Sequence, residues 1–278
     1  MHEWPLLIFT IFIQAAVGGV LILWIFQRIN VKIHTDTYPL LRQPLIVVSI
    51  LSLAGLAASF AHLGSIENSF HAVRGMGSSW MSREIISTGT FIGFTCMTTG
   101  LALVRRKVNT ILLFLSTIIG LGSVFSMGVV YSETLVNGWN HIHTYLAFFG
   151  SCFTLGAVLI VGLIAPALNS ESPATKMTKI AFFIAVVGIS IEAVGVALYS
   201  LGNFEIMMIN GNTVKTVLEG YQMIVGIRWI VVILGVGLLG YLTYSSRNRI
   251  SQFLSVAALI AVLAAEGISR YVFYVIGA

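Results

Sequence analysis

Ionisable side chains lie inside long apolar stretches of this 278-residue chain, where each costs at least a few kcal/mol. Such residues are candidates for function because membrane segments keep them mainly where they pair or do chemistry. A histidine and a carboxylate near the outer face of a membrane could accept the two protons that a hydroquinone loses on oxidation. An arginine at a similar depth could tune such a pocket electrostatically. The candidates are His62, Glu84, Glu192, Arg228 and the pair Glu266 with Arg270.

Several of these residues also have a purely structural interpretation. Glu266 and Arg270 are four residues apart, share a helical face and could form an internal ion pair that fixes the last helix. Arg228 could snorkel to the surface or cap backbone carbonyls. Glu192 could be a protonated carboxyl that is hydrogen-bonded to a neighbouring helix.

The composition predicts an all-α, polytopic integral membrane bundle rather than a soluble domain. The chain is 57% hydrophobic and 9% charged, with a mean hydropathy of +0.95, whereas about a quarter of the residues in soluble domains are charged. The apolar runs are continuous and do not alternate as in an outer-membrane barrel. We expect one transmembrane domain over residues 1–278, with eight helices of about 20 residues: Pro5–Phe26, Pro44–Leu63, Glu84–Val104, Thr110–Tyr131, Tyr145–Leu168, Ile180–Leu201, Gln222–Tyr244 and Phe253–Ile276.

The distribution of basic residues predicts the orientation of the bundle. Loops on the cytoplasmic side of a membrane are enriched in Lys and Arg. Ten basic residues follow the first, third, fifth and seventh helices, whereas three lie in the intervening loops, so both termini are expected outside, in the periplasm of a bacterium. His62 and Glu84 would then share a depth near the outer face, and Arg228 and Arg270 would each lie about 10 Å below it. The ten are Arg28, Lys32, Arg42, Arg105, Arg106, Lys107, Lys176, Lys179, Arg247 and Arg249; the three are Arg74, Arg83 and Lys215.

The sequence predicts no metal cofactor in this chain. Cys96 and Cys152 are far apart and cannot supply the thiolates of an iron–sulfur cluster. A b-type haem needs two axial histidines on facing helices, and His62 is the one histidine expected within a span. The net charge of +5 is interpreted as a topology signal, and no nucleic-acid partner is expected.

Glycine pairs at small-residue spacing predict close approach of helix backbones in lipid. Gly18 with Gly19, Gly120 with Gly122, and Gly188 with Gly195 are the pairs. No internal repeat is evident, which argues against a transporter built from inverted repeats.

Motifs at both ends of the chain resemble the membrane anchor subunit of bacterial dimethyl sulfoxide reductase. They are His2 to Leu6, Ile8 to Thr10 with Gln14, His62 to Ser65, Ser82 to Ile85, Arg228 with Trp229, and Glu266 to Arg270 with Val272 to Tyr274. The resemblance implies an eight-helix anchor in the cytoplasmic (inner) membrane that oxidises menaquinol and carries no haem. It also implies two partners, an iron–sulfur electron-transfer subunit and a molybdopterin catalytic subunit, and it places the quinol site at His62 and Glu84.

The resulting hypothesis is a quinol-oxidising anchor that is not an enzyme on its own. Menaquinol would enter from lipid near the outer face, hydrogen-bond to His62 and Glu84, and lie close to Arg228 and Arg270. Electrons would pass to an iron–sulfur cluster of the partner. Two alternatives stay open: a purely structural anchor without a quinone site, and a secondary transporter.

Overall fold

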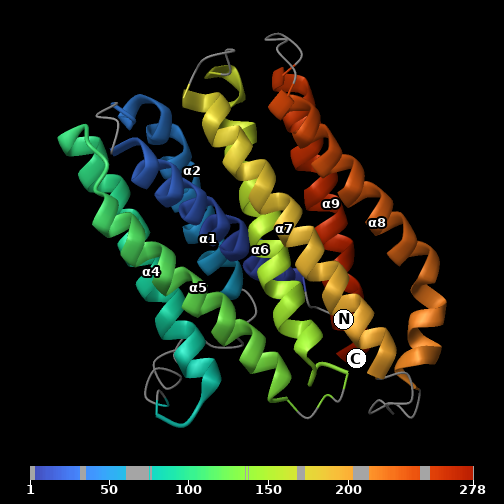
Figure 1. The fold of residues 1–278 in the computed structure, drawn as a ribbon. Helices are drawn as coiled ribbons and strands as arrows, with labels where there is room; N and C mark the ends of the chain where they lie inside the picture. Colours follow the sequence, from blue (N-terminus) through green and yellow to red (C-terminus); the bar gives the residue numbers. More distant parts are fainter. Residues whose placement is uncertain are drawn as a thin grey trace.

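The computed structural model is a bundle of long helices, with no strand among the residues that it describes (Figure 1). Those residues are 4–31, 36–60, 75, 77–134, 136, 138–167, 173–202, 213–244 and 251–277. Eight of the helices are long and apolar enough to cross a membrane. The all-α class and the eight long apolar helices are thus confirmed.

All of the helices except α6 are longer than the apolar runs that predict them, because polar and small residues extend them at the ends. The α-helices are α1 Trp4–Val31, α2 Tyr38–Phe60, α4 Trp80–Arg105, α5 Thr110–Ser132, α6 Ile142–Ile164, α7 Pro173–Gly202, α8 Val214–Tyr244 and α9 Ser251–Gly277, with a short 3₁₀ turn, η1, at Ala165–Ala167 after α6.

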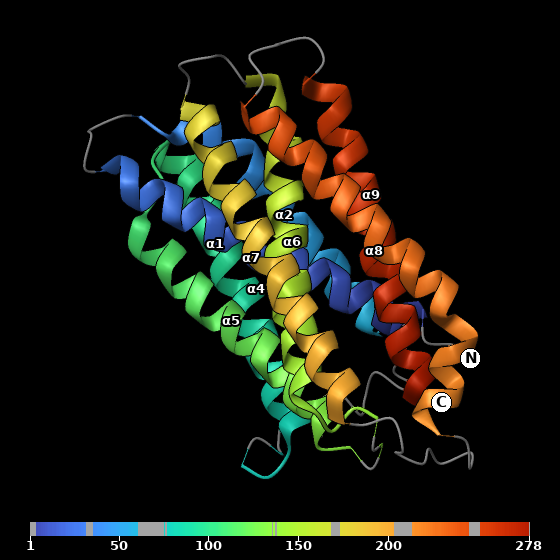
Figure 2. The same ribbon diagram turned by 45° about the vertical axis from the view of Figure 1, so that its right-hand side comes forward.

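Helices α1 and α6 form the core of the bundle. Within the apolar span of each, 72% of the residues are buried, compared with 28% in the spans of α8 and α9. Helix α1 packs against α2, α5 and α6, and α6 also packs against α7 and α9. Helices α8 and α9 form a pair at one side of the bundle, and α4 and α5 lie at the other (Figures 1 and 2). Side chains that leave α6 are therefore buried between helices.

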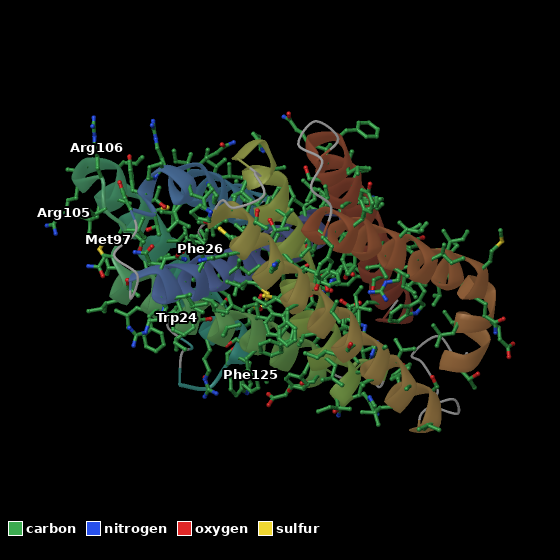
Figure 3. The ribbon with its side chains drawn as sticks, turned by 45° about the horizontal axis from the view of Figure 1, so that its top comes forward. Trp24, Phe26, Met97, Arg105, Arg106 and Phe125 are labelled. Carbon is green, nitrogen blue, oxygen red and sulfur yellow. The ribbon has the colours of Figure 1, made fainter. Side chains whose placement is uncertain are left out.

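Both termini lie at the same end of the bundle, which we call the terminal end (Figure 1). The opposite end carries basic residues of the described chain, including Arg28, Arg105 and Arg106, and Figure 3 shows the last two extending away from the end of α4. There the chain turns at Arg106, which has a φ of 52°, and Asn109 caps α5 by accepting from the Ile111 and Leu112 amides. That the terminal end faces the periplasm is still a prediction from the charges.

Helix α6 begins three residues before the predicted Tyr145, because His141 acts as its N-cap. The His141 Nδ1 accepts a hydrogen bond from the His143 amide at 3.0 Å, which satisfies a donor that a helix start leaves free. Desolvation lowers the pKa of His141, which favours the neutral imidazole that can accept this hydrogen bond. His143 thereby enters an apolar span, so the prediction that His62 alone would do so is wrong.

Glycines let the central helices approach closely. A Cβ on Gly18 would overlap the carbonyl oxygen of Cys152, and a Cβ on Gly156 would overlap the backbone of Gly18, so α1 and α6 meet backbone to backbone. Gly188 on α7 faces Gly150 on α6, where an added Cβ would lie 2.8 Å from its carbonyl oxygen. The glycine prediction is wrong for one residue, Gly122, because a Cβ there would meet open space.

Replacement of Gly156 by alanine is expected to destabilise the bundle, because the added methyl group collides with α1 backbone that no rotamer change can move. The cost should reach the upper end of the range of about 1–3 kcal/mol seen for overpacked cores. Gly122→Ala is the matched control. Thermal unfolding of the detergent-purified chain should show a lower midpoint for Gly156→Ala alone, and equal midpoints would contradict the close contact.

Candidate functional site

Four charged side chains from three helices are buried together between α7, α8 and α9. Glu192, Arg228, Glu266 and Arg270 are each at most 4% exposed. Arg228 pairs through Nη2 with the Glu192 carboxylate, and with Oε1 of Glu266 at 3.1 Å. Two positive and two negative charges make the group neutral, which is the condition under which charges persist away from water. We call these four residues the charged cluster.

The pairing inside the charged cluster differs from two of the predictions. Glu266 was expected to pair with Arg270 on its own helix, but its ion-pair partner among the described residues is Arg228 of α8. Snorkelling or capping was one of two interpretations open for Arg228, and its burial, with 4% exposed, argues against it. Spacing along one helix predicted a shared face correctly, but the neighbouring helices supplied the partner.

Arg228 also lies deeper than predicted. Helix α8 begins at Val214 and its apolar span at Val217, so Arg228 lies about 16 Å along the span rather than 10 Å. Glu192 and Glu266 are each about 14 Å from the terminal ends of their own spans by the same measure. The three residues therefore share one level, near the middle of a hydrocarbon core of about 30 Å.

The second carboxylate oxygen of Glu266 accepts a hydrogen bond from Ser151 of α6 at 2.5 Å. Glu192 fits against α6 because Gly150 has no side chain; a Cβ there would overlap the Cγ of Glu192. Helix α6 thus contributes the Ser151 hydroxyl group, and the absence of a side chain at Gly150 leaves space for Glu192. Buried charges with such hydrogen bonds are strongly fixed in place.

Arg270 joins α9 to α1 and α6 instead of pairing within the charged cluster. It donates to Oε1 of Gln14 at 2.9 Å. Its guanidinium lies over the Phe148 ring, 3.9 Å from the centroid, and 5.6 Å from that of Phe273. Stacking on aromatic rings stabilises a buried cation, but it leaves the Arg270 charge without a carboxylate in direct contact among the described residues.

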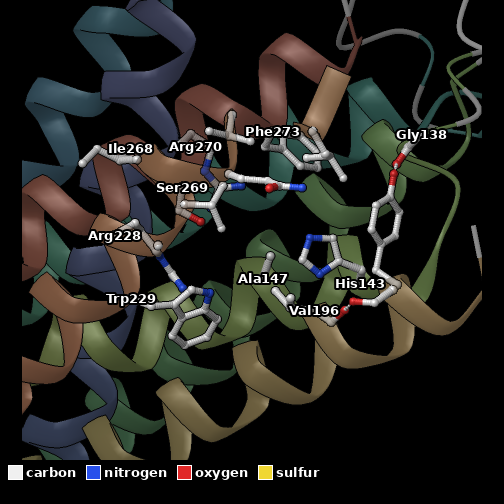
Figure 4. Close-up of a pocket in the computed structure, with 17 residues that line it drawn as sticks. Gly138, His143, Ala147, Val196, Arg228, Trp229, Ile268, Ser269, Arg270 and Phe273 are labelled. Atoms are coloured by element: carbon white, nitrogen blue, oxygen red, sulfur yellow. Dashed lines mark hydrogen bonds between the residues drawn. The ribbon is translucent and has the colours of Figure 1, made fainter. Parts of the chain in front are cut away.

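A cavity of about 400 Å³ lies between α6, α7, α8 and α9 on the terminal side of the charged cluster (Figure 4). Arg228 and Arg270 both line it, together with apolar and aromatic side chains and with His143. The Nδ1 of His143 is buried against Gly195 and has no hydrogen-bond partner of normal geometry among the described residues. This volume is within the range of about 300–1,000 Å³ that is typical of small-molecule pockets.

Glu84 lies at the terminal end of α4, half-buried. Its carboxyl is close enough to interact electrostatically with the hydroxyls of Tyr131 and Tyr274. Those two hydroxyls are hydrogen-bonded to each other at 2.9 Å, which links α5 to α9. Arg270 interacts electrostatically with both tyrosines as well. We call Glu84, Tyr131 and Tyr274 the Glu84 group; the predicted partner His62 lies outside the described residues.

A metal site is not evident in the described part of the chain, where no group of three His, Cys, Asp or Glu residues is placed to hold an ion. Cys152 is buried and Cys96 half-buried, and neither forms a disulfide.

Comparison with known proteins identifies the relatives of this protein. Residues 1–276 match the family model of the DMSO reductase anchor subunit (DmsC). The chain belongs to the DMSO reductase anchor subunit family. It is 25% identical to the C subunit of the anaerobic dimethyl sulfoxide reductase of Haemophilus influenzae over 277 residues, which cover 99% of this chain and 94% of that subunit. No solved structure matches it.

Two Escherichia coli K12 proteins are also similar over shorter segments. Identity to the C subunit of the anaerobic dimethyl sulfoxide reductase is 29% over 162 residues, which cover 57% of this chain and 56% of that subunit. Identity to the anaerobic dimethyl sulfoxide reductase subunit YnfH is 28% over 169 residues, with 60% and 59% covered. The family resemblance drawn from the motifs is confirmed. An anchor subunit implies catalytic and electron-transfer partner subunits, which this membrane-embedded protein serves.

Sequence reasoning missed several polar residues of this anchor subunit that the structure brings together. Tyr131 and Ser151 went unremarked, His143 was placed outside the spans, and Gln14 was noted only as part of a motif. A neutral polar side chain in the middle of an apolar run was the available signal for Gln14 and Ser151. His143 lay just beyond the predicted start of its helix, so only the capping by His141 reveals it.

Removal of Arg228 should destabilise the anchor subunit far more than removal of one of its partners. Arg228→Leu leaves two buried carboxylates unpaired, for which we expect a cost of about 3–5 kcal/mol. Glu192→Gln leaves the Arg228–Glu266 pair intact and should cost markedly less. Thermal unfolding in detergent measures both, and a Glu192→Gln variant as unstable as Arg228→Leu would contradict the shared ion pair.

Proposed function

We propose that this anchor subunit oxidises menaquinol at the terminal end of the bundle and passes the electrons to an iron–sulfur subunit. The observation that carries the proposal is that the Glu84 carboxyl lies within electrostatic range of the Tyr131 and Tyr274 hydroxyls, which are hydrogen-bonded to each other. Family membership supports it, because an anchor must connect its reductase to an electron donor in the membrane. The iron–sulfur subunit would in turn pass these electrons to a molybdopterin catalytic subunit.

The proposed reaction converts a hydroquinone to a quinone, with loss of two protons and two electrons. Glu84 and His62 are the proposed proton acceptors, since a carboxylate and an imidazole in hydrogen-bond reach of the ring hydroxyls can act as general bases near neutral pH. The two electrons leave to an iron–sulfur cluster that the partner subunit holds. The anchor itself undergoes no net change of oxidation state and depends on the partner subunit to accept the electrons. The anchor alone therefore has no turnover.

Tyr131 and Tyr274 would position the Glu84 carboxyl and its substrate. Each tyrosine can donate one hydrogen bond and accept others, so the pair can hold a ring oxygen while Glu84 takes its proton. Arg270 would stabilise the negative charge that develops on that oxygen, through its electrostatic interaction with the same group. With the terminal end outward, as the basic residues predict, the protons would be released into the periplasm across the bacterial inner membrane.

Replacement of Glu84 by glutamine should lower quinol-dependent turnover of the assembled complex by about 10²-fold or more, the usual contribution of a general base. Turnover with an artificial donor that reduces the partner subunits directly should be unchanged. Glu133→Gln is the matched control, because Glu133 is an exposed carboxylate at the same end of the bundle.

The same measurement separates the proposal from the structural-anchor alternative. Full quinol-dependent activity in Glu84→Gln would favour a tether in which Glu84 has no redox role. Equal loss with both donors would indicate failed assembly of that variant, and Glu84→Asp would then replace it, with partial retention of quinol-dependent turnover expected.

A further inference from the structure

The cavity between α6, α7, α8 and α9 has no role in the mechanism above. Glu84, Tyr131 and Tyr274 are not among the described residues that line it. We propose that this cavity binds the aromatic headgroup of a lipid-soluble quinol or quinone, at a position separate from the Glu84 group. The proposal rests on the proposed function for the identity of the ligand.

The walls of the cavity suit a flat aromatic ring. Trp229 and Phe273 contribute aromatic surfaces, and Ala147, Val196 and Ile268 contribute aliphatic ones. Apolar walls with a few polar groups are typical of cofactor and small-molecule sites. A volume of about 400 Å³ leaves room for a bicyclic headgroup and the first part of its tail.

The aromatic wall is held in place before any ligand arrives. Trp139 stacks on Phe273 with ring centroids 5.3 Å apart and an angle of 11° between the rings. Its indole N–H also donates to the Phe273 carbonyl at 2.8 Å. The Tyr199 hydroxyl donates to the carbonyl of Gly138, the residue that precedes Trp139, at 3.1 Å, which links α7 to the same segment. A pocket that is already ordered loses little conformational entropy on binding.

Two polar groups can recognise the oxygens of the ring. The His143 imidazole lies against the Tyr199 ring at 5.0 Å and lines the cavity (Figure 4). Since its Nδ1 is turned to α7, the other nitrogen is left to exchange a hydrogen bond with a ring oxygen. Arg270 lines the cavity from α9, where its guanidinium can donate to the second oxygen.

The charges around the cavity favour a neutral ligand over a phospholipid headgroup. Arg228 is already bonded to two carboxylates, which would repel a phosphate at that wall. Among the described lining residues, Arg270 is the one cation without a carboxylate in direct contact, and Glu266 interacts with it electrostatically at longer range. An acyl chain would offer no hydrogen-bond partner to the His143 imidazole or to the remaining N–H groups of Arg270, which is unfavourable in a buried site.

A glycine in the wall offers a clean way to fill the cavity. Gly226 of α8 lines it, and a Cβ added there would meet open space. Gly226→Leu therefore adds a bulky side chain at the wall of the cavity without backbone collision and with improved helix propensity. Gly237 is on the same helix, also has open space at its Cβ, and is not among the cavity's lining residues. Gly237→Leu is the matched control.

The test is fluorescence titration of the assembled complex in membranes with an alkyl hydroxyquinoline N-oxide, a quinol analogue. Gly226→Leu should raise the Kd of the probe at least tenfold, or remove one bound probe where the wild type binds two, whereas Gly237→Leu should bind as the wild type does. His143→Leu should weaken binding, and His143→Gln should restore part of it, because an amide can still hydrogen-bond. Co-purification of the partner subunits reports assembly of each variant.

The outcomes separate this inference from the proposed function. Unchanged probe binding in Gly226→Leu, together with quinol-dependent turnover that Glu84→Gln abolishes, overturns the cavity alone. Loss of a co-purified phospholipid from Gly226→Leu with unchanged probe binding also overturns it, and identifies the occupant as a lipid. A wild-type complex that neither binds the probe nor oxidises quinol overturns the proposed function, and the cavity's ligand with it.

Discussion

The bundle depends on one buried cation that is shared by two carboxylates. Arg228 lies at mid-depth of the spans, is almost fully buried, and is held by Glu192 of α7 and Glu266 of α9. Because each partner is on a different helix, the ion pairs join α7, α8 and α9 where the apolar surfaces alone give little preference between helices and lipid. The long, lipid-exposed pair α8 and α9 is thereby kept in register with the core.

The core helix α6 makes this arrangement possible through two small residues, Gly150 and Ser151. Gly150 leaves the space that the Glu192 side chain fills, and Ser151 next to it donates to Glu266. Successive residues of α6 thus serve both carboxylates. Helix α6 also meets α1 backbone to backbone at Gly156, so the charged cluster rests on the most enclosed part of the molecule.

The sequence was sufficient to predict the fold class, because eight apolar runs of membrane-spanning length have no other stable form in lipid. It was sufficient to select Glu192, Arg228 and Glu266 as buried charges, since composition alone makes them exceptional. The sequence was not sufficient to pair these charges. The partner of Glu266 depends on which helices are neighbours and on the level in the bundle at which each helix begins. His143 was missed for a local reason: an N-cap at His141 moved a helix start by three residues.

Arg270 is the residue through which the cavity and the Glu84 group, both near the terminal end, can affect each other. Arg228 is neutralised by direct contact with two carboxylates, whereas the direct partner of Arg270 is the neutral amide of Gln14. Its positive charge therefore acts on both the cavity that it lines and the tyrosine hydroxyls of the Glu84 group. A ring oxygen that loses a proton at either place becomes negative and is stabilised by the same cation. Under the proposed function, occupancy of one position would alter the electrostatics of the other without any movement of the helices, because the cation that they share is fixed by Phe148 and Gln14.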